Sequence, residues 1–249
     1  MHKLRTIFTG AMLGLAAPAM AGTLVDITAA PYGAGGQGGG IRVGSLGFAN
    51  FGPTGRFDVS GAFVASMAPF IAQTFCFDVT KPLFTGAPDN RFQIMSLSAF
   101  SPNAIKQAQV AALLLNTRSL IDNAMTVGAR DIAAVATGLA VWEILYETGT
   151  TGYSVTGSDG TTGNGNFFTY GDFTTYQSTT NAYLANVENG SWTGSADRIR
   201  TLVSVTGNGQ NQVTIAPVPE PATWAMMIGG FSLIGTALRR RNNAALRLV

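Results

Sequence analysis

The sequence predicts a mainly β exported domain with a helical insert, preceded by a signal peptide and followed by a transmembrane helix. Short apolar runs alternate with Gly and Pro between residues 41 and 77, a pattern typical of β-strands. Helical periodicity replaces that pattern between about residues 101 and 148. Both ends of the 249-residue chain combine an apolar segment with basic residues, as targeting and membrane segments do.

Residues 1–21 have the features of a secretory signal peptide. A short basic start precedes the mostly apolar stretch 7–17. Ala19 and Ala21 then place small residues at the two positions that signal peptidase requires, so we expect export through the Sec translocon and cleavage after Ala21. An N-terminal membrane anchor is not expected, because it would need roughly 18 or more apolar residues.

The strands and helices of residues 22–216 predict one exported domain. Strands are expected in 41–77 and 91–100, and again in IRTLVSVTG and QNQVTIAP near the end of the domain. The glycine-rich stretch 33–40 is expected to be a flexible loop. Strands on both sides of a helical insert predict a β-sandwich-like body that carries a small α subdomain.

The insert itself, at about residues 101–148, contains two predicted helices. Ser101 and Pro102 have the residue types of a cap and a first helical position, so the first helix is expected to open there. The second is expected over 130–147, where apolar residues recur at intervals of three and four. A further short helix is expected at 181–188.

The composition of this domain excludes several functions. Twelve acidic and nine basic side chains give it a net charge of −3, although the whole chain has a net charge of +2. We therefore expect no binding to nucleic acid, which requires a basic surface.

Histidine and cysteine are almost absent from the chain. His2 is the only histidine and lies in the predicted signal peptide, so the domain has no catalytic Ser-His or Cys-His pair and no histidine metal ligand. Cys76 is the only cysteine, which rules out a disulfide within the chain. We expect no cofactor, no metal and no enzymatic activity, with a glycosidase that uses two carboxylates left open.

The uncharged stretch 222–238 is predicted to span the membrane. As a helix its seventeen residues would be about 25 Å long, at the short end of what a bilayer accepts. Trp224 near its start suits the lipid–water interface, and Arg239, Arg240 and Arg241 after it suit the cytoplasmic side. A buried core helix would be expected to show a polar stripe instead.

The motif before this helix has the features of a protease recognition site. Pro219 and Pro221 hold the backbone extended and present Glu220 on a stiff strip. With Trp224 and the arginines, residues 217–249 resemble the PEP-CTERM sorting signal in its PEPxxWA variant. The resemblance implies recognition by an exosortase, a membrane cysteine protease of Gram-negative bacteria, and removal of the tail near the motif.

Two further stretches resemble the Cys–Gln thioester domain of bacterial surface adhesins. They are FCFDVTKP at 75–82 and ATGLAVWEILYE at 136–147. Cys76 falls on the reactive cysteine, but Gly138 falls on the glutamine of the helix motif. Because glycine has no side-chain carbonyl for the thiolate to attack, the resemblance implies a degenerate site. Gln73 or Gln107 could in principle replace the missing glutamine.

These observations predict a non-enzymatic protein that passes through an inner-membrane intermediate to the cell surface or extracellular matrix. The PEP-CTERM resemblance links such proteins to biofilm formation and makes an exopolysaccharide partner plausible. Two alternatives stay open: a covalent adhesin that uses Cys76, and a single-pass membrane protein whose tail is not cleaved.

Overall fold

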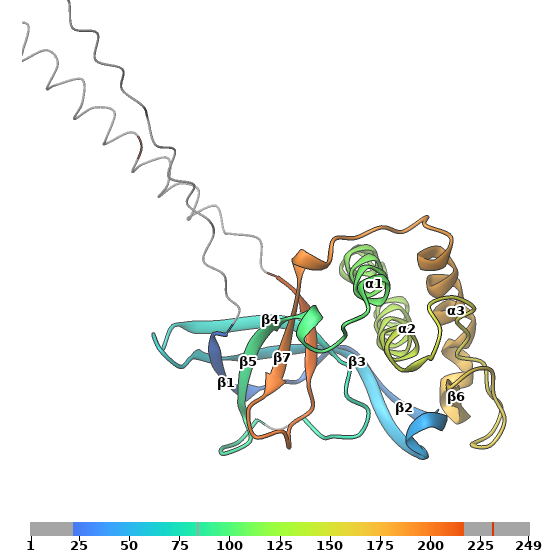
Figure 1. The fold of residues 1–249 in the computed structure, drawn as a ribbon, viewed down its shortest axis with the longest axis horizontal. Helices are drawn as coiled ribbons and strands as arrows, with labels where there is room; N and C mark the ends of the chain where they lie inside the picture. Colours follow the sequence, from blue (N-terminus) through green and yellow to red (C-terminus); the bar gives the residue numbers. More distant parts are fainter. Residues whose placement is uncertain (1–21, 84, 217–230, 232–249) are drawn as a thin grey trace, which may run out of the picture.

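A computed structural model of the protein describes residues 22–83, 85–216 and 231. Six antiparallel strands form a closed barrel in the order β1, β5, β7, β8, β4 and β3, and β3 pairs again with β1. Strands β2 and β6 extend the sheet beyond β3, and three α-helices lie together on one side of the molecule (Figure 1).

The strands and helices have the following bounds. The strands are β1 (Leu24–Ala29), β2 (Tyr32–Val43), β3 (Phe48–Phe63), β4 (Pro69–Cys76), β5 (Arg91–Ser96), β6 (Phe167–Tyr170), β7 (Ile199–Ser204) and β8 (Gln212–Ile215). The helices are α1 (Ala104–Asp122), α2 (Val127–Tyr146) and α3 (Thr174–Glu188).

The prediction of a mainly β body is confirmed, but the sandwich-like arrangement is wrong. A sandwich needs two separate sheets, whereas all eight strands of the described residues belong to a single sheet. Near its C-terminal end β3 pairs with β4 along one edge and with β1 along the other, as in the register pairs Ser60–Ile71 and Val25–Phe63. This double pairing closes the barrel, because it leaves no free edge at that end of β3.

Apolar side chains fill the barrel. Val25 lies opposite Phe92 between β1 and β5, and Ile94 lies opposite Leu202 between β5 and β7. All four are buried. Residues that face each other across an antiparallel pair project from the same face of the sheet, so these two pairs form neighbouring parts of one core.

The glycine-rich stretch 33–40 lies in β2, so the prediction of a flexible loop is wrong. It pairs with β3 over almost its whole length and with β6 at Gly40. The glycines leave room for aromatic rings above the strand. A Cβ at Gly39 would lie 2.5 Å from the Phe173 ring, and one at Gly40 would lie 2.2 Å from the Tyr170 ring.

The helical insert is present, with different ends from those predicted. Asn103 caps α1, not Ser101: its side-chain oxygen accepts hydrogen bonds from the backbone N–H groups of Ile105 and Lys106 at 3.0 and 3.2 Å. Helix α3 starts at Thr174, seven residues before the predicted start. Helix α2 packs against β2 and β3 through a run of small buried residues, which permits close approach to the sheet.

The predicted targeting segments, 1–21 and 217–249, contain only Phe231 among the described residues. The predicted cleavage site at Ala19 and Ala21 and the predicted transmembrane helix 222–238 therefore fall outside the part of the chain that can be compared. In the described residues, no helix has the length and apolar character needed to cross a bilayer.

Candidate functional site

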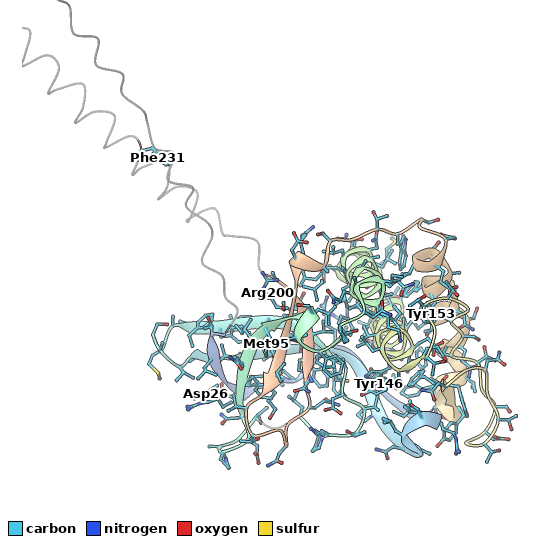
Figure 2. All side chains as sticks on the ribbon, in the orientation of Figure 1. Asp26, Met95, Tyr146, Tyr153, Arg200 and Phe231 are labelled. Carbon is cyan, nitrogen blue, oxygen red and sulfur yellow. The ribbon has the colours of Figure 1, made fainter. Side chains whose placement is uncertain are left out.

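Cys76 is buried at the end of β4, where the barrel meets helix α2. The side chain is 1 % exposed, between Phe75 and Phe77, which are also buried. Tyr146 lies at the end of α2 (Figure 2). Its hydroxyl oxygen accepts a hydrogen bond at 3.3 Å from the N–H of Val79, in the segment just after β4. Solvent therefore has no direct access to the thiol.

Burial also controls the protonation of Cys76. It raises the pKa of the thiol to about 12, while the Thr54 hydroxyl beside it lowers the pKa by a smaller amount and the Asp78 carboxylate raises it. The thiolate is the nucleophilic form of cysteine. Around neutral pH the group is thus protonated and a weak nucleophile.

Gly138, the second residue of the predicted thioester site, lies in α2 next to the same threonine. A Cβ on Gly138 would be 2.3 Å from Thr54 Oγ1. Thr54 is fully buried, and its hydroxyl makes no hydrogen bond of ordinary geometry. The fold thus brings both Cys76 and Gly138 next to Thr54, and the Thr54 side chain fills the space that a larger residue at 138 would need.

A glutamine that the sequence did not single out lies opposite Cys76. Gln212 on β8 is the direct register partner of Cys76 on β4, and it is fully buried. Directly opposed residues of an antiparallel pair have Cβ atoms about 4.5–5.5 Å apart. The side-chain carbonyl of Gln212 accepts a hydrogen bond from the Thr74 hydroxyl at 3.0 Å, and its amide group donates to the Gln210 side-chain oxygen at 3.3 Å.

The two glutamines suggested from the sequence have other surroundings. Gln73 is exposed on β4, three positions before Cys76. Gln107 on α1 donates to the Ser101 carbonyl at 2.7 Å. The only sequence signal for Gln212 was its place in the predicted strand QNQVTIAP, and strand periodicity does not specify which residue a strand pairs with.

The described residues contain no candidate metal centre. No group of three or more acidic, cysteine or histidine side chains among them is close enough to hold an ion. Asp159, in the loop before β6, uses its carboxylate within the protein: it accepts hydrogen bonds from the backbone and side chain of Thr161 at 2.8 and 2.6 Å and from the Thr162 backbone at 2.8 Å.

Comparison with protein families gives a match near the C-terminus. Residues 217–241 match the family model of the PEP-CTERM protein-sorting motif. This protein carries a PEP-CTERM sorting motif. The matched range contains Pro219, Glu220, Pro221 and Trp224 as well as the arginines at 239–241.

The motif marks an exported protein that an exosortase recognises and processes at the membrane. The match covers 25 residues and none of the barrel or the helices. Comparisons with curated proteins and with solved structures gave no match for any part of the chain. The role of the exported domain therefore has to be argued from its own geometry.

Proposed function

We propose that this chain is a non-enzymatic protein of the cell surface or extracellular matrix, delivered by exosortase processing in a Gram-negative bacterium. The observation that carries the proposal is the sorting motif at residues 217–241. The lack of histidine after His2 supports a role without conventional acid–base catalysis. An exopolysaccharide of the same matrix is the proposed partner, and biofilm formation the proposed context.

The intact mass of the protein from its native host tests this proposal. We expect a mass that begins at Gly22 and ends near Pro219–Pro221 in the surface or medium fraction. Substitution Glu220→Gln should leave the full C-terminus attached and hold the protein in the membrane fraction, whereas Asp172→Asn, an exposed site outside the motif, should change nothing. A wild-type chain that extends to Val249 and occurs only in membranes would mean that the tail is a permanent anchor.

The exopolysaccharide partner needs a separate test. Protein released from the surface should sediment with purified exopolysaccharide of the host and remain in solution without it. Equal sedimentation with an unrelated neutral polysaccharide would show that the interaction is not specific to this matrix.

The pairing of Cys76 with Gln212 favours a second function, covalent adhesion through an internal thioester. In this reaction the Cys76 sulfur attacks the side-chain carbonyl carbon of Gln212. A C–S bond replaces the C–N bond, and the amide nitrogen leaves as ammonia with the thiol proton. Because solvent has no direct access to Cys76 in the described conformation, the segment after β4 would have to move away from Tyr146 first. An amine on a host or matrix surface would then attack the thioester, form an amide and regenerate the thiol. Gln212 thus offers the amide that Gly138 lacks.

The intact mass also tests this second function. A thioester lowers the mass by one ammonia, blocks reaction of Cys76 with thiol reagents in the denatured protein, and adds methylamine when that amine is supplied. The deficit should disappear in Cys76→Ala and in Gln212→Met but persist in Gln73→Met, which alters an exposed glutamine of β4. A full mass with a free thiol in the exported wild-type protein would rule out covalent adhesion and leave the first function intact.

A further inference from the structure

A cavity of about 440 Å³ opens where the short strand β8 ends. It lies between strands β4, β7 and β8 and the C-terminal half of α1. Figure 2 shows Arg200, one of its lining residues, at the start of β7. Strand β4 pairs with β8 only from Thr74 to Cys76, so the first half of β4 has no neighbour on that side among the paired strands. The gap in the sheet leaves room for the cavity.

Apolar side chains make up most of the wall. Phe75, Ile94, Ile121 and Leu202 are buried at its edges, and Ile71 on the unpaired half of β4 is 77 % exposed. A cavity of this size and character falls within the range of small-molecule sites, which are largely apolar with a few polar groups that orient the ligand.

Three arginines and one aspartate supply the charge at this cavity. Arg56 and Arg118 share Asp122: Arg56 forms an ion pair with one carboxylate oxygen, and Arg118 Nε lies 3.5 Å from the other. Arg200 also lines the cavity and donates to the backbone carbonyls of Asp197 and Ile199 at 2.6 and 2.8 Å. The lining therefore carries an excess of positive charge within a domain whose net charge is negative.

Arg56 provides an independent indication of a ligand. The residue is 7 % exposed, and its Nε atom is buried without a hydrogen-bond partner although Asp122 pairs with another nitrogen of the same guanidinium. A buried donor without a partner costs free energy, more so when the group is charged. Arg56 also lines the cavity, so a small rotation of its guanidinium would uncover Nε and let an anion in the cavity supply the missing acceptor.

We propose that this cavity binds a small amphiphile with an apolar chain and one carboxylate, such as a medium-chain fatty acid. The carboxylate would accept hydrogen bonds from Arg56 Nε and from the guanidinium groups of Arg118 and Arg200. The chain would lie against Phe75, Leu202 and Ile71. This inference does not depend on how the protein is sorted or on a thioester, because none of the cavity-lining residues belongs to the motif or to the Cys76–Gln212 pair.

Photolabelling of the full-length chain in phosphatidylcholine nanodiscs tests the site. The probes are decanoic acid and decanol, each carrying a diazirine at the end of the chain, and the labelled residues are mapped by peptide mass spectrometry. We expect the acid to label residues of β4, β8 or α1 around the cavity, and the alcohol to label them at least about tenfold less, the loss expected for a charge-assisted hydrogen bond. Unlabelled decanoate, but not acetate, should compete.

The substituted side chains are exposed or half-buried, so the test does not require a change in the core. Arg118→Gln combined with Arg200→Gln should reduce labelling by the acid about tenfold or more, and Ile71→Glu should reduce it by placing a negative charge on the wall. Arg91→Gln, an exposed arginine of β5 outside the cavity, is the matched control and should not change it. Equal labelling by acid and alcohol, unchanged labelling in the double variant, or labels only outside the cavity would overturn the proposal.

Discussion

The barrel and the β2–β6 extension of the same sheet are packed in different ways. Large side chains fill the barrel, where Phe92 and Leu202 are completely buried. In the extension, glycines of β2 bring the backbone against its neighbours: Gly39 lies under Phe173, and a Cβ at Gly35 would be 3.0 Å from the Val135 side chain of α2.

The barrel and the extension should therefore be destabilised by opposite kinds of substitution. Removing side-chain atoms from the barrel core leaves a cavity, because the paired strands around it cannot move together to fill the space. Adding atoms to the extension forces rings and a helix away from the strand. Stability should therefore fall with large-to-small changes in one region and with small-to-large changes in the other.

The largest effect is expected in the barrel. Phe92→Ala should lower the free energy of unfolding by about 3–5 kcal/mol, because it deletes a completely buried ring. Urea unfolding of the full-length chain, followed by tryptophan fluorescence, measures the change. Leu46→Ala alters a side chain that is 52 % exposed and serves as the control, with an expected change within about 0.5 kcal/mol.

The helical side contains a buried carboxyl group, which makes its stability depend on pH. Burial raises the pKa of Glu143 from 4.5 to about 8, partly offset by the hydrogen bond from the Ser154 N–H. The folded chain keeps this proton while the unfolded chain loses it, so stability should fall by a few kcal/mol as pH rises from about 4.5 to about 8.

Substitution Glu143→Gln tests that prediction, since the amide cannot ionise. Unfolding curves at a series of pH values should show a flatter profile for the variant than for the wild type between about 4.5 and 8. If both profiles have the same slope, Glu143 ionises in the folded protein as it does in water, and its burial is looser than the structure indicates.

The extension should respond to a single added methyl group. Gly39→Ala should cost about 1–3 kcal/mol, because its Cβ would overlap the completely buried Phe173 ring. Gly52 is the register partner of Gly39 on β3 and has open space at its Cβ position, so Gly52→Ala is a matched control. Thermal unfolding of the two variants compares them directly; equal loss would mean that backbone freedom, not ring packing, explains the glycines.

The smallest effect concerns the start of α1. Asn103→Ala should cost about 1 kcal/mol, because the Asn103 side chain satisfies the first N–H groups of the helix. Ser101→Ala should cost less, although the sequence pattern favoured Ser101 as the cap. Urea unfolding decides between them, and a larger loss in Ser101→Ala would contradict the capping geometry described above.

Local patterns predicted some elements well and others badly. The spacing of apolar residues located α2 to within a few residues, because a helix makes its hydrogen bonds with near neighbours in sequence. Gly33–Gly40 was predicted to be a loop, because its glycines lack the setting of a dinucleotide-binding fingerprint. Glycine is also a poor strand former. What keeps this stretch in β2 is its pairing with β3 and the rings of Tyr170 and Phe173, more than 100 residues away.

In the candidate site, too, some residues could be found from local sequence patterns and one could not. The cysteine and the helix of the thioester resemblance could be found from short motifs, and the structure places both next to Thr54. Gln212 could not be found in this way, because its relation to Cys76 depends on the register between β4 and β8. Periodicity indicates which face of a strand a residue occupies but carries no information about register.

Composition and short motifs were sufficient to find the sorting motif and to show that the exported domain contains no histidine. The sorting motif is a contiguous segment read by another protein, and the absence of histidine beyond His2 is a property of the residue list. The closure of the barrel, the Cys76–Gln212 pair and the arginine-lined cavity required the folded chain. Each depends on residues far apart in sequence, and these residues come together only when the strands have paired in the correct order and register.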